Sequence, residues 1–380
     1  MAFIGFRLKS KDNKNSMKIN KVLFLAVILL SNLIQRLNAQ TEEAPKIILI
    51  TIDGFRWQEL FNGADKDLIS NNLYVQNPNQ LKDVFWNDTR IERRKKLMPF
   101  LWSSVKEMGQ IHGNRSVGSK MDLTNEYWFS YPGYSEILTG KADERIQSND
   151  KINNPNKTIL ELANNLTQYN GKVGAFGSWD VFPFIINEER SGIHVNAGFK
   201  IAEAVDLTNK EKFLNDLQAK IPRPWYSVRH DAFTHYYALE YMKRTHPNLI
   251  YIAYGETDDF AHDGNYEAYL KSAHTTDSFI KELWNFVESD SYYKGNTTLI
   301  ITTDHGRGTL PLDTWRDHGK DTDGADEVWV IAFGKGIRPL GEIKVKEQLY
   351  TNQIAASIAE LLNIELAKNK IGAKFEFITY

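Results

Sequence analysis

Cysteine is absent from this chain of 380 residues. Its absence excludes disulfides, thiolate-bound metal sites, cysteine nucleophiles and a lipid-anchored cysteine at the start of a mature chain. Any metal ion must therefore be bound by His, Asp, Glu or hydroxyl groups. The sequence also has no internal repeat and no low-complexity linker that would separate domains, which favours one large domain.

The N-terminus has the pattern of an export signal. Two lysines precede the apolar run 22–30, which is too short to span a bilayer, and Ala39 then offers a small residue for cleavage. The alternatives are a membrane anchor or a buried strand, which the polar segment that follows disfavours. We therefore expect residues 1–39 to be a signal peptide, with Met17 as an alternative start. The mature protein would be periplasmic or secreted, without a stable membrane anchor.

The charge balance argues against one class of partner. Without residues 1–39 the chain keeps 39 basic and 47 acidic residues, a formal net charge of −8. This balance disfavours nonspecific binding to nucleic acid. Small phosphate-bearing molecules, nucleotides among them, can still be substrates where the local charge is positive. The oligomeric state is left open.

Five short apolar runs are typical of buried strands in a parallel sheet. They lie at residues 47–52, 173–176, 249–254, 299–303 and 328–333. Helical patterns lie between them, most clearly over residues 266–287. This alternation predicts a three-layer α/β/α sandwich with a mostly parallel central sheet. Residues 40–380 would form a single catalytic domain, with an insertion around residues 65–125.

Acids and histidines recur where these runs end, and ligands gather beyond the carboxyl ends of parallel strands. The side chains are Asp53 after the first run, Glu256, Asp258 and His262 after the third, Asp304 and His305 after the fourth, and His318 ahead of the fifth. Each motif alone is weak, because a lone His262 is more often a surface histidine and Asp304 a helix cap. Their recurrence favours a centre of carboxylates and imidazoles, which Zn²⁺ accepts when thiolates are missing.

The segment 128–140 offers a nucleophile. Pro132 fits the first turn of a helix, so Ser130 would lie at the free N–H groups and positive dipole of a helix N-terminus. A zinc ion on its Oγ would lower the pKa of the hydroxyl. Ser135 is the competing candidate and would lie deeper in the helix. The alternative is that Ser130 only caps the helix.

In this order the motifs resemble those of the alkaline phosphatase superfamily, with the nucleotide pyrophosphatase/phosphodiesterase branch and related metalloenzymes as the nearest likeness. The matching motifs are Asp53-Gly54-Phe55, Ser130-Tyr131-Pro132 with Leu138-Thr139-Gly140, Glu256-Thr257-Asp258 with His262, Asp304-His305-Gly306 and His318-Gly319. The resemblance spans about residues 46–335, and five ordered motifs are far more specific than one.

The resemblance implies two divalent metal ions, assigned as Zn²⁺. One would be held by Asp53, Ser130, Asp304 and His305, and the other by Asp258, His262 and His318. It also implies that Ser130 attacks phosphorus to give a phosphoseryl intermediate, which water then hydrolyses. Asn149 resembles the asparagine that holds a phosphoryl oxygen in this branch, and the alternative is an ordinary turn residue.

Departures from the family bear on the reaction. Ser130 stands where the phosphodiesterase branch usually has Thr, and Gly133 replaces the usual Asn, yet the hydroxyl is kept. Residues 177–182 lack the Lys and Arg of some monoesterase relatives, and the Arg that a sulfatase needs after Ser130 is missing. We predict an exported two-metal phosphoester hydrolase, a phosphodiesterase ahead of a phosphatase, acting on a small-molecule phosphoester. The alternatives are a phosphoryl or sulfuryl transferase, a sulfatase-like member, or a non-catalytic metal-binding relative.

Two further groups of side chains bear on the substrate. Aromatic residues that would stack on a base or apolar leaving group, or else belong to the core, are Tyr127, Trp128, Trp179, Phe182 and Phe184. Basic residues that would bind a second anionic group, or else be solvated surface charges, are Arg307, Arg316 and Lys320.

Overall fold

The computed structural model describes residues 44–366 and 372–378, and the export signal expected at residues 1–39 lies outside them. Within the described residues, eight strands form the central sheet in the order β10-β2-β9-β7-β1-β6-β4-β5. Their bounds are β1 Lys46–Ile52, β2 Gly109–His112, β4 Val173–Gly177, β5 His194–Ala197, β6 Leu249–Tyr254, β7 Thr297–Thr302, β9 Val330–Gly334 and β10 Gly341–Glu342. A second, smaller sheet joins β3 Ser119–Asp122 to β8 Glu327–Val328 and β11 Glu347–Tyr350.

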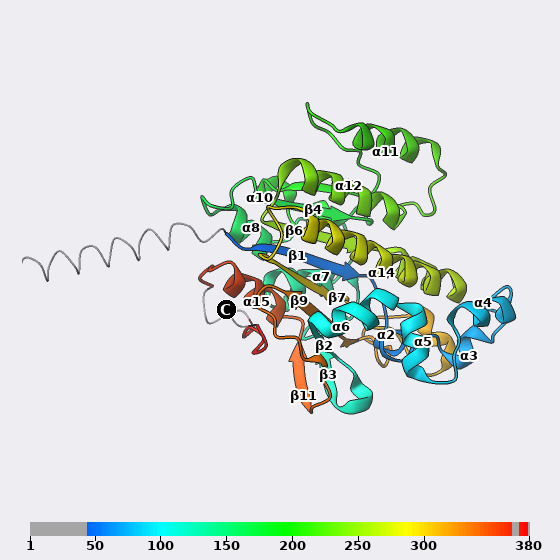
Figure 1. Cartoon of the computed structure of the whole chain (residues 1–380). Coiled ribbons are helices and arrows are strands. Elements are labelled where there is room, and N and C mark those ends of the chain that lie inside the picture. The colour runs from blue at the N-terminus through cyan, green and yellow to red at the C-terminus, as the bar shows by residue number, and fades with distance from the viewer. Residues whose placement is uncertain (1–43, 367–371, 379–380) are drawn as a thin grey trace, which may run out of the picture. The chain divides into compact units, whose positions relative to one another are not determined.

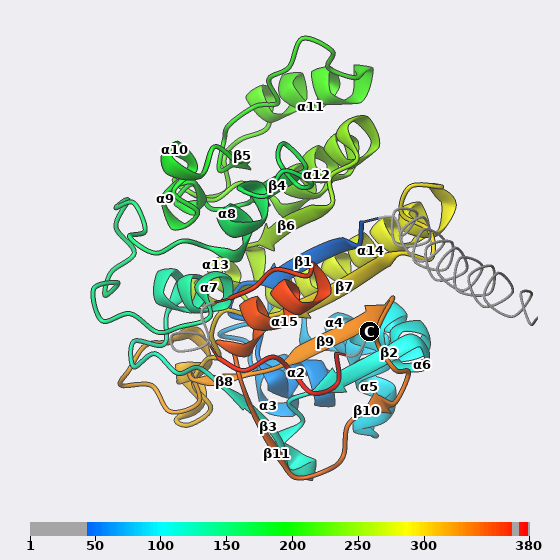
Figure 2. The same cartoon turned by 90° about the vertical axis from the view of Figure 1, so that its left-hand side faces the viewer.

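Helices cover both faces of the central sheet (Figures 1 and 2). On one face α14 packs with α12 and α5, and on the other α7 packs with α8 and α15. The helix bounds are α2 Trp57–Asn62, α3 Lys66–Ile69, α4 Pro78–Phe85, α5 Arg90–Leu97, η1 Leu101–Val105, α6 Lys106–Met108, η2 Arg115–Val117, α7 Ser130–Thr139, α8 Ile159–Asn164, α9 Phe182–Ile185, α10 Glu188–Ser191, α11 Asn209–Lys220, α12 Asp231–Thr245, α13 Glu256–His262, α14 Tyr266–Ser289, η3 Leu312–Arg316 and α15 Gln353–Leu361. The predicted three-layer sandwich is confirmed.

Strand β1 lies at the centre of this sheet, between β6 and β7. It pairs in parallel with both, so that Ile50 lies opposite Ile252 on one side and Ile301 on the other. All seven residues of β1 are buried, because helices cover both faces of the sheet. The continuous apolar run at residues 47–52 follows from this double burial. The helix predicted over residues 266–287 is confirmed as α14.

The fifth predicted strand differs from the prediction in its direction. The run 328–333 was expected to be a parallel strand, but β9 pairs antiparallel with both β7 and β2. The reason is the connection between the two strands. The chain leaves β7 at one end of the strands and enters β9 from that same end, so β9 runs in the opposite direction. Strands β2, β5 and β10 went unpredicted, because each is only two to four residues long.

The segment 65–125 contributes to two parts of the fold. It forms α3, α4, α5 and α6, as an excursion would, but its strand β2 is also part of the central sheet. Contacts group Pro45–Tyr380 into one compact unit.

Among the described residues, no helix is both long enough and apolar enough to cross a membrane.

Candidate active site

The first group of predicted site residues lies where β1 and β7 end. Asp53 follows β1, and its Oδ1 lies 3.4 Å from His305 Nε2. Asp304 follows β7, and its Oδ2 lies 3.5 Å from the same nitrogen. Ser130, at the start of α7, has its Oγ 3.3 Å from that nitrogen as well. The structure thus brings together the four residues assigned to the first ion, which we call the first cluster.

The second group lies on α13 and in the loop ahead of β9. Asp258 and His262 are one helical turn apart, and Asp258 Oδ2 lies 3.2 Å from His262 Nε2. The Nε2 of His318 lies 3.0 Å from His262 Nε2 and 3.8 Å from Asp258 Oδ1. We call these three residues the second cluster. Asp258 Oδ1 is also 3.8 Å from His305 Nε2, so the two clusters adjoin.

Two carboxylate oxygens in the first cluster lack hydrogen-bond partners. Asp53 Oδ1 and Asp304 Oδ2 are buried and accept no hydrogen bond from the described residues. Their companion oxygens are occupied, since the hydroxyl of Tyr134 donates to Asp53 Oδ2 at 2.7 Å and the N–H of Gly54 donates to Asp304 Oδ1 at 3.1 Å. A buried anionic oxygen without a partner is costly unless a cation neutralises it. Carboxylate oxygens beside an imidazole nitrogen therefore fit a divalent metal ion.

The pKa shifts in the first cluster also favour a bound divalent cation. Burial raises the pKa of Asp53, and the negative charge of Asp258 raises it further. Burial and the Asp53 charge likewise hold the pKa of Asp304 well above its usual range. Burial alone would lower the pKa of His305, but Asp304 and the other carboxylates raise it to about 9. The clustered carboxylates thus create an excess of negative charge that a divalent cation would balance.

Arg307 is buried beside the second cluster and does not lie at the surface. Its side chain is fully buried, forms an ion pair with Asp258, and places Nη2 3.3 Å from His262 Nδ1. Burial acts to raise the pKa of Asp258, but Arg307 and the nearby histidines outweigh it and hold that pKa well below its usual range. Arg307 is therefore not a solvated surface charge; it orients Asp258, whereas Arg316 and Lys320 are exposed.

Ser130 is the first residue of α7 and follows the N-cap position. Phe129 takes the N-cap position in an extended conformation and makes no side-chain cap. The hydroxyl of Ser130 is therefore not a helix cap, and it faces His305 instead. The competing Ser135 lies deeper in the helix, where its Oγ accepts a hydrogen bond of 3.0 Å from Asn154 Nδ2. The geometry favours Ser130 over Ser135 as a nucleophile.

Asn149 meets the N-terminus of α7. Its Oδ1 accepts a hydrogen bond of 3.0 Å from the backbone N–H of Tyr131, the residue after Ser130. Asn149 is otherwise exposed. With its oxygen used in this way, the side-chain NH₂ group of Asn149 is the donor that remains for a ligand beside Ser130.

Sequence reasoning missed two residues that hold Asp53. Tyr134 lies four positions after Ser130, hence on the same face of α7, and it donates to the Asp53 carboxylate. That spacing was a usable signal. Thr257 donates its hydroxyl to the backbone oxygen of Asp53. This second contact depends on β1 and β6 being neighbours, which the local sequence does not reveal.

Gly133 lets α7 approach the loop that carries Asp304. A Cβ atom at this position would lie 2.2 Å from the Asp304 backbone oxygen. We expect Gly133→Ala to displace α7, to lower the free energy of unfolding by about 1–3 kcal/mol and to lower kcat/KM by more than about 10-fold through misplacement of Ser130. Denaturant unfolding and steady-state kinetics measure the two effects.

The matched control for this change is Gly171→Ala. Gly171 has a φ of 70°, so alanine there strains the backbone, but its Cβ would meet no atom within 4 Å. This variant should lose stability and keep its kcat/KM. If Gly133→Ala retained the wild-type kcat/KM, the close approach of α7 would not matter for the site.

The fold and the site together define an alkaline phosphatase-like α/β structure whose carboxylates and imidazoles suit divalent metal ions. A family model described as the Metalloenzyme superfamily matches residues 226–366. This matched segment contains the whole second cluster and also Asp304 and His305. Asp53 and Ser130 precede it in the chain.

Solved structures share this fold at low sequence identity. Alkaline phosphatase PafA aligns over 90% of this chain and 100% of its own, with a TM-score of 0.57 and 10% identity. The lipoteichoic acid synthase LtaP from Listeria monocytogenes covers 88% of this chain and 76% of its own, with a TM-score of 0.55 and 12% identity. The phosphonate monoester hydrolase SpPMH from Silicibacter pomeroyi has the same coverage, a TM-score of 0.55 and 13% identity. The predicted resemblance to the alkaline phosphatase superfamily is confirmed. A search of curated protein sequences found no match.

Proposed function

We propose that this chain is an exported two-metal phosphoester hydrolase in which Ser130 is the nucleophile. The observation that carries the proposal is the position of Ser130 Oγ, at the N-terminus of α7 and 3.3 Å from His305 Nε2. Beside it lie the buried carboxylate oxygens of Asp53 and Asp304 that accept no hydrogen bond from the described residues. In that position a bound metal ion would activate the hydroxyl, and the N-terminus of α7 would attract the phosphate group of the substrate.

The two clusters supply donor sets for two Zn²⁺ ions. The first set is Asp53, Ser130, Asp304 and His305, and the second is Asp258, His262 and His318. When bound, the ions would lower the pKa of the serine hydroxyl and neutralise charge on the leaving oxygen. Arg307 keeps Asp258 in the orientation that the second set needs.

The chain's own groups carry the two steps. Ser130 Oγ attacks phosphorus, and the Oγ–P bond forms as the bond from phosphorus to the leaving oxygen breaks. The serine hydroxyl gives up its proton, and the leaving group takes up a proton and departs as an alcohol. The positive end of the α7 dipole favours negative charge at this point. The side-chain NH₂ of Asn149 would hold a phosphoryl oxygen, since its Oδ1 is already bound to the N–H of Tyr131. Water then attacks phosphorus and breaks the Oγ–P bond, which restores Ser130 and releases phosphate or a phosphomonoester.

Diesters fit the charge of the site better than monoesters. A monoester dianion needs more positive charge around it than a diester monoanion. The buried cation beside the clusters, Arg307, is already paired with Asp258. Residues 177–182 contribute no Lys or Arg. A sulfatase-like reaction is disfavoured, because no arginine follows Ser130 at the spacing that activation would require.

A substrate panel tests the proposal. Purified protein would be assayed with bis(4-nitrophenyl) phosphate, 4-nitrophenyl phosphate and 4-nitrophenyl sulfate, with bound metal measured on the same sample. We expect hydrolysis in that order of kcat/KM, with about two zinc ions per chain. Faster turnover of the sulfate ester would replace the phosphoesterase assignment, and a protein without bound metal or turnover would favour a non-catalytic relative.

Export is a separate part of the proposal and rests on the first 39 residues. N-terminal sequencing of the mature protein from its native host should begin close to Gln40. An intact N-terminus at Met1 or Met17 would contradict it.

A further inference from the structure

A hollow of about 390 Å³ opens directly beside the second cluster. His318 of that cluster is one of its lining residues. Tyr127 and Phe129, from the segment ahead of α7, form one wall, and residues 319–322, after His318, form the other. A hollow of this size is large enough for a small organic group. Its place next to His318 puts that group on the side of the second cluster.

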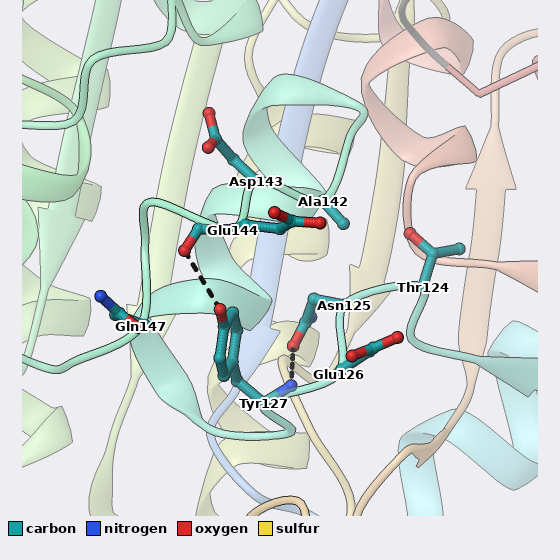
Figure 3. A pocket seen from close by; sticks show the side chains of 8 residues that line it. All are labelled: Thr124, Asn125, Glu126, Tyr127, Ala142, Asp143, Glu144 and Gln147. Carbon is teal, nitrogen blue, oxygen red and sulfur yellow. Dashed lines mark hydrogen bonds between the residues drawn. The ribbon is translucent and has the colours of Figure 1, made fainter.

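The aromatic wall is held by side-chain hydrogen bonds and not by loop packing alone. Asn125 Oδ1 accepts from the backbone N–H groups of Tyr127 at 3.0 Å and Trp128 at 3.1 Å. The fully buried carboxylate of Glu136, on α7, in turn accepts from Asn125 Nδ2 at 2.9 Å. The hydroxyl of Tyr127 donates to the backbone oxygen of Glu144 at 3.1 Å. Figure 3 draws a separate pocket that shares Tyr127 with this hollow, and it shows the hydrogen bonds of Tyr127 to Asn125 and Glu144.

This anchoring imposes a strained backbone. Trp128 has a φ of 52°, a left-handed conformation that is costly for a bulky residue and persists only where the surroundings enforce it. Its backbone oxygen accepts a hydrogen bond of 2.9 Å from the N–H of Gly319, which ties the aromatic wall to the opposite one. The rings of Tyr127 and Phe129 lie 6.1 Å apart and tilted by 55°. The hollow is therefore preorganised.

Charge gives the hollow little selectivity. Lys320 and Asp321 both line it, so one charge of each sign faces a ligand. Aromatic rings, by contrast, bind a flat partner through burial and stacking, which depend on shape. The selectivity of the hollow should come from its aromatic wall.

We propose that this hollow receives the leaving group of the phosphoester and that it selects a flat aromatic group, packed against the rings of Phe129 and Tyr127. The inference rests on the proposed function and adds that the leaving oxygen departs on the side of the second cluster, which contains His318. It makes Phe129 and Tyr127 specificity-determining residues and names aryl-bearing phosphoesters as the substrate class.

The test compares two leaving groups that are both primary alcohols, one with a phenyl ring and one without it. Values of kcat/KM would be measured for 2-phenylethyl phosphate and n-butyl phosphate, and for the corresponding symmetric diesters. We expect the wild type to prefer the phenylethyl ester of each pair. Phe129→Leu and Tyr127→Leu should each lower the phenylethyl-to-butyl ratio by at least about 3-fold, because leucine keeps the apolar bulk and loses the ring.

Two variants serve as controls. Tyr127→Phe keeps the ring and loses only the hydrogen bond to Glu144, so its ratio should stay within about 2-fold of wild type. Phe213→Leu removes a 62% exposed ring on α11, outside the residues that line the hollow, and should not change the ratio.

The outcomes separate the two proposals. Equal losses on both esters in Phe129→Leu and Tyr127→Leu would overturn the leaving-group assignment, since the wall would then only position α7. So would a wild type without preference for the phenylethyl esters. A wild type that hydrolyses neither these esters nor the nitrophenyl phosphates would overturn the proposed function itself.

Discussion

Ser130→Ala is expected to lower kcat/KM for phosphoesters by at least about 10³-fold, because it removes the nucleophilic oxygen. The side chain is small and makes no helix cap, so the melting temperature should change little, whereas bound metal should fall by at most about one ion per chain because Ser130 belongs to the first donor set. Steady-state kinetics, thermal unfolding and metal analysis on one preparation measure the three quantities. Mass spectrometry of acid-quenched wild type during turnover should further detect a phosphoryl group on Ser130.

Ser135→Ala is the matched comparison, since Ser135 lies on the same helix and offers the same hydroxyl. It removes the acceptor of the Asn154 hydrogen bond, so we expect a loss of stability of about 1–3 kcal/mol. Its kcat/KM should stay within about 10-fold of wild type. Full activity in Ser130→Ala, or loss of activity confined to Ser135→Ala, would show that the nucleophile is wrongly assigned.

Removal of divalent metal by a chelator is expected to abolish hydrolysis and to destabilise the protein. Asp53, Asp304 and Asp258 bring their carboxylates around His305, each with an oxygen 3.4–3.8 Å from its Nε2. Without a cation these charges repel one another in a buried setting. A metal held at 100 times its dissociation constant stabilises the folded state by about 2.7 kcal/mol per site. Kinetics and thermal unfolding, before and after Zn²⁺ is restored, measure both effects.

Variants at the two clusters sharpen this test. His305→Ala and His262→Ala remove one imidazole from the first and the second cluster, respectively. Each should lower bound metal by about one ion per chain and kcat/KM by at least about 100-fold. His274→Ala is the control, because His274 lies on α14 and its Nδ1 contacts the backbone oxygen of Leu97 at 2.8 Å. Chelated protein that keeps its rate would contradict a metal-dependent reaction.

The sequence predicted the strands near the centre of the sheet better than those at its edges. Strands β1, β6 and β7 are buried on both faces, and each contains a short apolar run. Edge strands β5 and β10 are short and have no such pattern. Their place in the sheet depends on pairing with β4 and β2, respectively, and β2 is distant from β10 in sequence.

The direction of β9 is the clearest case in which the structure corrects a prediction from the sequence. The corrected direction also explains how His318 reaches the site. Had β9 been parallel, as predicted, the loop ahead of it would have crossed to the opposite end of the strands. His318 would then lie near that end. Because β9 is antiparallel, the loop between β7 and β9 starts and ends at the same end of the sheet, where Asp304 and His305 follow β7. The second cluster thus depends on a reversal that periodicity cannot detect.

The sequence by itself determined which residue types could bind metal and in what order they occur, because the absence of cysteine and the recurrence of Asp and His after apolar runs are local features. It also indicated Ser130 through Pro132, which lies in the first turn of α7. Only the tertiary structure decided which oxygens remain without partners, that Arg307 is buried against Asp258, and that Phe129 and Tyr127 border the same hollow as His318. These facts depend on distances between segments far apart in the chain, and such distances are set when the sheet and its helices pack together.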